Sequence, residues 1–235
     1  MQARGEAQRQ TEQTVLNLAG SGLSIADVDS GSASVRAILS VTSGVINAAA
    51  GTTGVTISGN GTATLTLNGS QAAINDLLAG NSGATLTYIN NSDNPPASAT
   101  FTLTANDLGR TGVGGVLTDF DTATISIAAV NDAPLLARGT TLTFTENSPA
   151  RVINGSLTVS DPDNTTLSSA TVSISNNFQA GQDVLAFNNT NPTTFGNIAA
   201  SYDPATGVLS RVAVSEADGD VLPAWSVTLF RFGLK

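Results

Sequence analysis

Two acidic pairs with the same spacing could bind a metal ion. Asp27 and Asp29 occur in the stretch GLSIADVDSG, and Asp161 and Asp163 occur in SLTVSDPDN. The residues before each pair predict a strand, and alternate residues of a strand share a side, so each pair would project two carboxylates in one direction. Two close negative charges repel unless a cation or hydrogen-bond donors lie between them. Ca²⁺, which takes about six to eight oxygen ligands, meets this requirement.

A turn is the alternative role for the same acids. An Asp side chain at the end of a strand often accepts a hydrogen bond from the backbone two residues further on. Such a turn needs no metal. The residue types alone leave both interpretations open.

The acidic pairs recur with a fixed offset. Asp161 follows Asp27 by 134 residues, and Glu146 follows Glu12 by the same 134 residues. Each Glu lies 15 residues before the pair of its own copy. Because the two motifs share one offset, the sequence predicts two copies of one module and favours a cation over a turn alone.

The joint between the copies is expected at the stretch 131-Asn-Asp-Ala-Pro-134. Asn and Asp favour turns, and Pro134 cannot donate a hydrogen bond to a strand ladder. The first copy would cover residues 8–132 and the second residues 133–235. The second copy would open with a strand from Leu135 to Phe144.

The charge of the chain excludes some partners. Acidic residues outnumber basic residues by 18 to 9, which gives a net charge of −9. The basic residues form no cluster, so neither nucleic acid nor an anionic membrane surface is an expected partner. No apolar run reaches the roughly 18 residues that a membrane span needs.

The residue inventory also excludes most catalytic chemistry. The chain has no His and no Cys, which removes Ser-His-Asp and Cys-His catalysis and nearly all zinc and copper sites. The one Lys is Lys235. Hydrolysis by paired acids remains, but one Trp and two Tyr are a poor supply of aromatic platforms for a glycosidase. An enzyme is therefore the least favoured class.

The composition indicates an all-β protein. Val, Ile and Thr suit half-buried strands, and 23 Gly with many Asn, Asp and Ser supply turns. In the first copy, strands are predicted over residues 15–18, 23–26, 35–41, 54–58, 63–67, 85–89, 99–105 and 122–130. Gly59-Asn60-Gly61 is typical of a hairpin turn. Residues 71–79 are predicted as a short helix that packs on the core, with Ser70 as its N-cap and Gly80 as its stop.

The first copy resembles a known family over about residues 11–134. The motifs, in order, include GLSIADVDSGSA, GVTISGNGTATLTLNGSQAAINDLLAG, FTLTANDLG and TATISIAAVNDAP. They are similar to the cadherin-like and Ig-like tandem repeats of large bacterial surface adhesins of the RTX type. The stretch TFTENSPARVINGSLTVSDPDN resembles a sister class of repeat from the same proteins. The resemblance implies Greek-key β-sandwiches strung head to tail, with calcium at or near the junctions.

The resemblance also implies a set of calcium ligands. Glu12, Asn131, Asp132, Asp161 and Asp163 would converge at the joint. Asp27, Asp29 and Asp107 would form the same half-site at the free end of the first copy. Glu146 would serve a following repeat.

The expected function is structural rather than enzymatic. The chain is interpreted as part of an extracellular or bacterial cell-surface adhesin, with neighbouring repeats as partners and Ca²⁺ stiffening each joint. A module that binds carbohydrate or a cell-surface host protein is the alternative. The family pattern is lost after Leu209, so the second sandwich would be incomplete, with an open edge for strand-mediated self-association.

Overall fold

The structure is a computed structural model of the chain. It describes residues 2–4, 8–110, 115–137, 141–145, 148–153, 159–164, 167, 169–187 and 198–213. The chain divides into two compact units, Met1–Val130 (unit 1) and Asn131–Lys235 (unit 2), and each is described by itself. Glu146 and the segment 214–235, on which two of the expectations above depend, lie outside the described residues.

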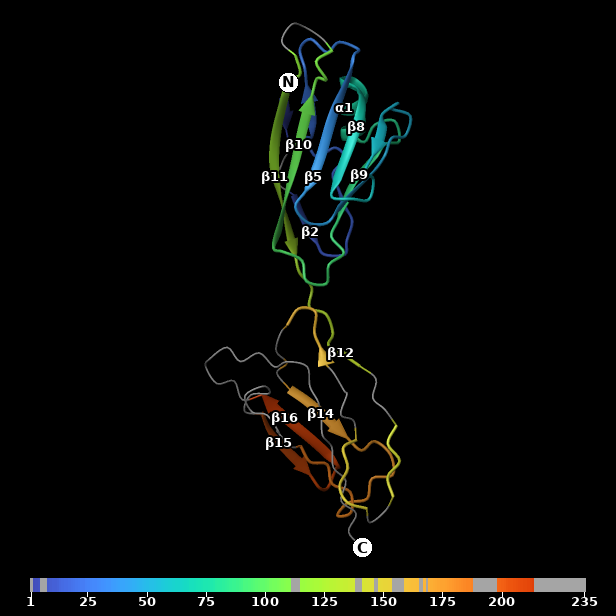
Figure 1. Cartoon of the computed structure of the whole chain (residues 1–235), viewed down its shortest axis with the longest axis vertical. Helices are drawn as coiled ribbons and strands as arrows, with labels where there is room; N and C mark the ends of the chain where they lie inside the picture. The colour runs from blue at the N-terminus through green and yellow to red at the C-terminus, as the bar shows by residue number, and fades with distance from the viewer. Residues whose placement is uncertain are drawn as a thin grey trace. The chain divides into compact units, whose positions relative to one another are not determined.

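Unit 1 contains a six-stranded sheet in the order β2-β11-β10-β5-β8-β7 (Figure 1). Its strands are β2 (Gln8–Thr11), β5 (Ser34–Val41), β7 (Thr56–Ser58), β8 (Thr64–Ser70), β10 (Ser98–Asn106) and β11 (Thr118–Ala128). Strand β2 runs parallel to β11, whereas the other neighbours are antiparallel. Glu12 follows β2 and Val130 follows β11, so both residues lie at the same end of this sheet.

A second sheet of unit 1 has the order β3-β9-β6 and is antiparallel. Its strands are β3 (Leu16–Asn17), β6 (Val45–Ala49) and β9 (Thr85–Ile89). Strand β1 (Gln2–Arg4) pairs separately with β4 (Ser24–Ala26). The inward residues of both larger sheets join one hydrophobic core, so the all-β prediction with a single short helix is confirmed and fits a β-sandwich.

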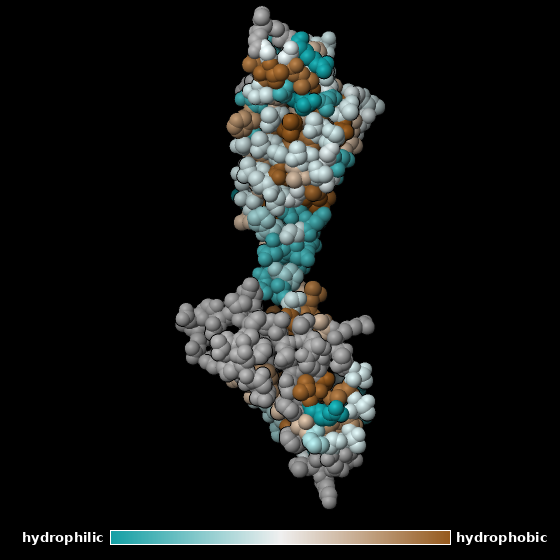
Figure 2. Space-filling view, viewed as in Figure 1, coloured by the Kyte–Doolittle hydropathy of each residue, from teal (hydrophilic) through white to brown (hydrophobic). Residues whose placement is uncertain are grey.

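The alternation along β10 explains how the core forms. Ala99, Phe101, Leu103 and Ala105 are buried, while the three Thr residues between them lie on the outer side of the sheet. Figure 2 shows the outer face of unit 1 as mostly pale, the hydropathy that Thr and Ser have. A strand with one buried and one solvated face produces this period of two.

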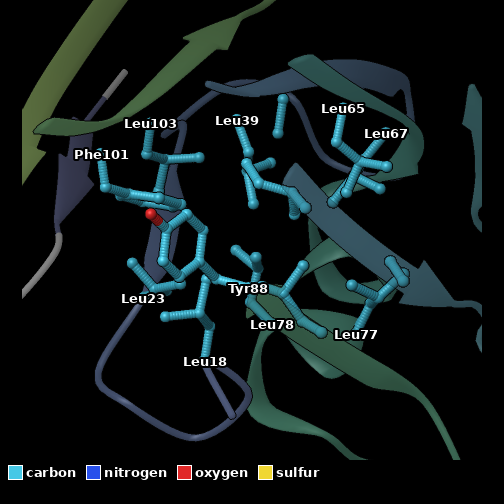
Figure 3. Close-up of a cluster of buried hydrophobic side chains, with 14 of the residues drawn as sticks. Leu18, Leu23, Leu39, Leu65, Leu67, Leu77, Leu78, Tyr88, Phe101 and Leu103 are labelled. Carbon is cyan, nitrogen blue, oxygen red and sulfur yellow. The ribbon is translucent and has the colours of Figure 1, made fainter. Parts of the chain in front are cut away.

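Tyr88 lies at the centre of the core, where its ring packs among Leu18, Leu23 and Phe101 (Figure 3). Its hydroxyl donates to the Ser43 carbonyl at 2.9 Å, so the buried polar end is satisfied. Burial raises the pKa of Tyr88 above its ordinary value, against a smaller lowering by a hydrogen bond with Asn90. The tyrosine therefore acts as a neutral core residue.

Helix α1 (Gln71–Ala79) begins and ends as predicted. The Ser70 hydroxyl accepts from the Ala73 amide at 3.2 Å, and Gly80 adopts the left-handed conformation at φ 76°. Ile74, Leu77 and Leu78 are buried. The prediction of a helix that packs on the core is confirmed.

Two side chains of α1 also pair with the chain around β4. The Asn75 side chain accepts from the Ile25 amide and donates to the Ile25 carbonyl, both at 2.9 Å. One turn earlier, Gln71 Oε1 accepts from the Asp27 amide at 2.9 Å. The helix thus supplies the hydrogen bonds that a neighbouring strand would otherwise make, which keeps that edge of β4 from pairing with another chain.

The predicted Gly59-Asn60-Gly61 turn joins the antiparallel strands β7 and β8. It also covers the edge of β6, because the Ile46 amide donates to Thr62 and the Gly61 amide donates to Ile46, both at 2.9 Å. The Asn60 side chain accepts from the Ala48 amide at 2.7 Å. Strand β6 itself was not among the strands expected from the sequence.

The described part of unit 2 is smaller. Strands β14 (Ser169–Ser173), β16 (Val208–Ala213) and β15 (Ile198–Asp203) form an antiparallel sheet, in that order. Strand β12 (Leu135–Leu136) pairs with β13 (Val159–Ser160). The expected strand from Leu135 to Phe144 is therefore wrong in its length, since residues 141–145 lie in no strand.

Candidate cation-binding carboxylates

Glu12 is the most buried of the predicted ligands in unit 1, with 3% of its surface exposed. It follows β2, and its amide donates to the Ala128 carbonyl at 3.0 Å. Its Oε1 atom accepts from the Val130 amide, also at 3.0 Å. The second oxygen, Oε2, is buried and has no hydrogen-bond partner among the described residues. A buried carboxylate oxygen without a partner is costly, so this atom calls for a cation or a bound water.

Gln10 presents a second such oxygen on the same side of the chain. It lies two residues before Glu12 and is 7% exposed, and alternate residues of a strand share a side. Its Nε2 group donates to the Thr14 carbonyl at 2.9 Å, whereas its Oε1 atom is buried without a partner in the described structure. Gln10 is not among the ligands predicted from the sequence, although its Gln-x-Glu spacing with Glu12 is a usable signal. Side-chain amide oxygens are ordinary calcium ligands.

Asp27 and Asp29 lie in a turn beyond β4, which ends at Ala26. The expectation that they share one face of a strand is therefore wrong. Asp27 Oδ1 accepts from the Asp29 amide at 3.3 Å, as the turn interpretation predicts. The other oxygen of Asp27, Oδ2, is buried and has no partner among the described residues. The turn accounts for one oxygen and leaves the other to a ligand or solvent.

Asp107 closes the loop between β10 and β11. Its Oδ1 atom accepts from the Leu117 and Gly109 amides, both at 2.8 Å. The hydrogen bond from the Leu117 amide, followed by that from the Gly109 amide, lowers the pKa of Asp107 below its ordinary value. This loop-closing role explains the burial of Asp107 without any metal.

Unit 2 repeats the turn of unit 1. Asp161 Oδ1 accepts from the Asp163 amide at 3.0 Å and from the Asn164 amide at 2.9 Å. Asp163 Oδ2 accepts from the Asp132 amide at 2.5 Å. The Asn131 side chain donates to the Asp132 carbonyl at 3.1 Å. The acids at the start of unit 2 are thus held together by backbone amides.

Hydrogen bonds bring some of the predicted ligands together within each unit. Asp161, Asp163 and Asp132 form a connected set in unit 2, and Asp27 and Asp29 form one in unit 1. In the part of the chain that the structure describes, no three Asp, Glu, His or Cys side chains form a group that could hold a metal ion. The calcium sites therefore stay predictions. Glu12 and Gln10 supply suitable oxygens beside Val130, and Asp27 supplies one at the opposite end of unit 1, beside the start of α1.

A cavity of about 310 Å³ is present in the described part of unit 2. Ile153, Ile174 and Leu185 give it apolar walls, and Asn176, Asn177 and Asp183 give it polar groups. Its size is at the lower end of small-molecule sites, which span roughly 300–1,000 Å³.

Among the described residues, no helix is long and apolar enough to cross a membrane.

No protein-family model matches the chain. The chain is 34% identical over 98 residues to Halomucin from Haloquadratum walsbyi, a match that covers 42% of the chain and 1% of the relative. The match thus spans only a very small part of the length of that relative. A solved structure titled BspA_C_WT aligns with 96% of the chain and 84% of its own length, at 8% identity and a TM-score of 0.26.

Proposed function

We propose that the chain is a non-enzymatic structural repeat segment of an extracellular or cell-surface adhesin-like protein. In this proposal, Ca²⁺ binds carboxylates beside the segment 130–132 and stiffens the connection between the repeats. The observation that carries the proposal is Glu12, a 3%-exposed carboxylate with one oxygen that no described residue satisfies.

The chemistry of the oxygens favours Ca²⁺ over other cations. Beside the segment 130–132, Glu12 offers a carboxylate oxygen and Gln10 an amide oxygen, both buried and without described partners. Ca²⁺ accepts such mixed oxygen sets in flexible geometry, whereas Mg²⁺ demands a near-ideal octahedron. Extracellular modules bind Ca²⁺ with dissociation constants of about 0.1–1 mM, which suits a site that is filled outside the cell.

Two further features support a structural repeat. The Asp turn of unit 1 recurs in unit 2 with the same hydrogen bond between its two acids. The similarity to Halomucin covers only 1% of that protein, as expected for one segment of a long chain of modules.

Thermal unfolding with and without calcium tests the proposal. With a dissociation constant of ~1 mM, 10 mM CaCl₂ would stabilise the site by about 1.4 kcal/mol and raise the melting temperature of unit 1 by roughly 5 °C relative to chelator. The variant Glu12→Gln should lose most of this shift, because the amide is a weaker ligand. Asp76→Asn on α1, with the same change in charge, should keep it. An equal shift in Glu12→Gln and the parent chain would refute the assignment of Glu12.

A ligand-binding module remains the second candidate, because of the cavity in unit 2. Its apolar walls and polar groups fit a small molecule with an apolar body and a hydrogen-bonding end. A glycan array and a fragment screen by NMR test this version. Shifts at Ile174 and Leu185 would support it, and the absence of any hit would remove it.

A further inference from the structure

Backbone amides on both sides of Asn131 are held by carboxylates. On one side, the Val130 amide donates to Glu12 Oε1 at 3.0 Å, across 118 residues of sequence. On the other, the Asp132 amide donates to Asp163 Oδ2 at 2.5 Å. Each bond lies within its own unit, and neither involves a metal.

Both hydrogen bonds have a carboxylate as the acceptor, although the linker itself is exposed. A hydrogen bond to an ionised carboxylate is roughly twice as strong as one between neutral groups. Glu12 is 3% exposed, so water competes little for its Oε1 atom. Val130, by contrast, has 48% of its surface exposed, and the residues around it are exposed as well. The linker backbone is therefore held by two carboxylates in a region that offers little burial of its own.

We propose that Glu12 and Asp163 are positioning residues that hold the linker 130–132 through its amides whether or not a metal is bound. Because the bonds fix the nitrogens of Val130 and Asp132, rotation is confined to the backbone torsions of Val130 and Asn131. Val130 and Asn131 together are thus the hinge. This inference goes beyond the proposed function, since it requires no calcium.

We call the hydrogen bonds of Glu12 to the Val130 amide and of Asp163 to the Asp132 amide the clamp. The clamp and the calcium site can coexist on Glu12. The clamp uses Oε1, whereas the oxygen without a described partner is Oε2. A cation on Oε2 would add to a linker that is already ordered. The two roles are separable by substitution, because a glutamine keeps an oxygen that can accept from Val130 but is a weaker calcium ligand.

Amide hydrogen exchange of the full chain, followed by NMR in excess chelator, tests the clamp. After correction for intrinsic rates, the Val130 and Asp132 amides should exchange at least about tenfold more slowly than the Asn131 amide. Glu12→Ala should remove the protection of Val130 alone, and Asp163→Ala that of Asp132 alone. Glu12→Gln and Asp163→Asn should retain most of it. The Leu103 amide in β10 reports whether unit 1 of each variant is folded.

The outcomes separate the clamp from the calcium proposal. If Val130 and Asp132 exchange as fast as Asn131 in chelator, the clamp is refuted. If they become protected only when Ca²⁺ is added, the metal orders the linker, and the clamp is refuted while the proposed function is supported. Protection in chelator, with no effect of Ca²⁺ on melting, would support the clamp and count against the calcium site.

Discussion

The two units differ most in their cores. In unit 1, one hydrophobic cluster draws buried residues from both larger sheets and from α1. In the described part of unit 2, Leu185 and Leu209 are the buried members of a cluster whose other side chains, such as Phe187 and Tyr202, are only partly buried. Because burial of apolar surface drives folding, unit 1 should be the more stable unit. The proposed calcium ligands Glu12 and Gln10 would thus be held by the more stable of the two units.

The largest expected effect comes from replacing one buried leucine in the core of each unit by alanine. Leu39 is 0% exposed in unit 1, and Leu209 is 2% exposed in unit 2. Leu39→Ala should lower the free energy of unfolding of unit 1 by about 3–4 kcal/mol, because the surrounding core cannot collapse into the cavity. Leu209→Ala should cost unit 2 only about 2 kcal/mol, since its half-exposed neighbours can move. Urea unfolding, with NMR signals assigned to each unit, measures both values.

An equal or larger loss in Leu209→Ala would contradict the comparison. It would show that unit 2 has a core as tightly packed as that of unit 1. The slopes of the two urea transitions provide a check, because the slope grows with the surface exposed on unfolding.

A smaller effect is expected at two glycines that touch aromatic rings. Gly44 has φ 82°, and a Cβ atom there would lie 2.7 Å from both Tyr88 and the Ile89 carbonyl oxygen. Gly207 has φ 69°, and its Cβ atom would lie 2.7 Å from Phe178. Both alanine substitutions strain the backbone, but Tyr88 is fully buried and Phe178 is half-buried. We expect Gly44→Ala to cost about 3 kcal/mol and Gly207→Ala about 1–2 kcal/mol, as measured by thermal unfolding.

A third glycine, Gly83, shows what the positive φ alone costs when alanine replaces glycine. Gly83 also has a positive φ, 72°, but a Cβ atom there meets nothing within 4 Å. Gly83→Ala should therefore cost only the backbone strain, about 1 kcal/mol. If Gly44→Ala costs no more than Gly83→Ala, neither the Tyr88 ring nor the Ile89 carbonyl is fixed beside Gly44 as described.

How far the sequence predicts this molecule depends on how local each feature is. Helix α1 was predicted in full, because Ser70, the apolar spacing and Gly80 are consecutive signals. Strand β10 was predicted as residues 99–105, one residue short at each end. By contrast, the bond from Val130 to Glu12 joins residues 118 positions apart, and no local pattern specifies such a contact.

The acidic motifs show a different limit. Asp27 and Asp29 were expected on one face of a strand, yet β4 ends at Ala26 and the pair forms a turn. The same residue types serve both purposes, so the sequence could not separate them. Gln10 was missed because a neutral amide carries no charge signal, although its buried oxygen lacks a described partner.

The smallest expected effect is the response to acid, which compares one carboxylate in each unit. Hydrogen bonds from Leu117 and Gly109 lower the pKa of Asp107, and bonds from Thr206 and Ala205 lower the pKa of Asp203. A carboxyl group whose folded pKa is depressed stabilises the fold above its unfolded pKa, near the ordinary 3.8. That stability is lost as the pH falls from about 4 through the folded pKa.

Melting temperatures between pH 7 and pH 2 measure this response. Asp107→Asn should reduce the fall of the melting temperature at low pH for unit 1 alone. Asp203→Asn should reduce it for unit 2 alone. If the melting temperatures of both variants fall at low pH as in the parent chain, other carboxyl groups govern the loss of stability. A change in the wrong unit would contradict the division of these hydrogen bonds between the units.

Calorimetric titration of Ca²⁺ into the metal-free chain tests the central claim most directly, that buried carboxylate oxygens near the linker take a calcium ion. We predict binding with a dissociation constant of about 0.1–1 mM, weakened roughly tenfold or more by Glu12→Gln and unchanged by Asp76→Asn. No binding heat up to 10 mM Ca²⁺ at two temperatures, or the same affinity in Glu12→Gln as in the parent chain, would contradict it.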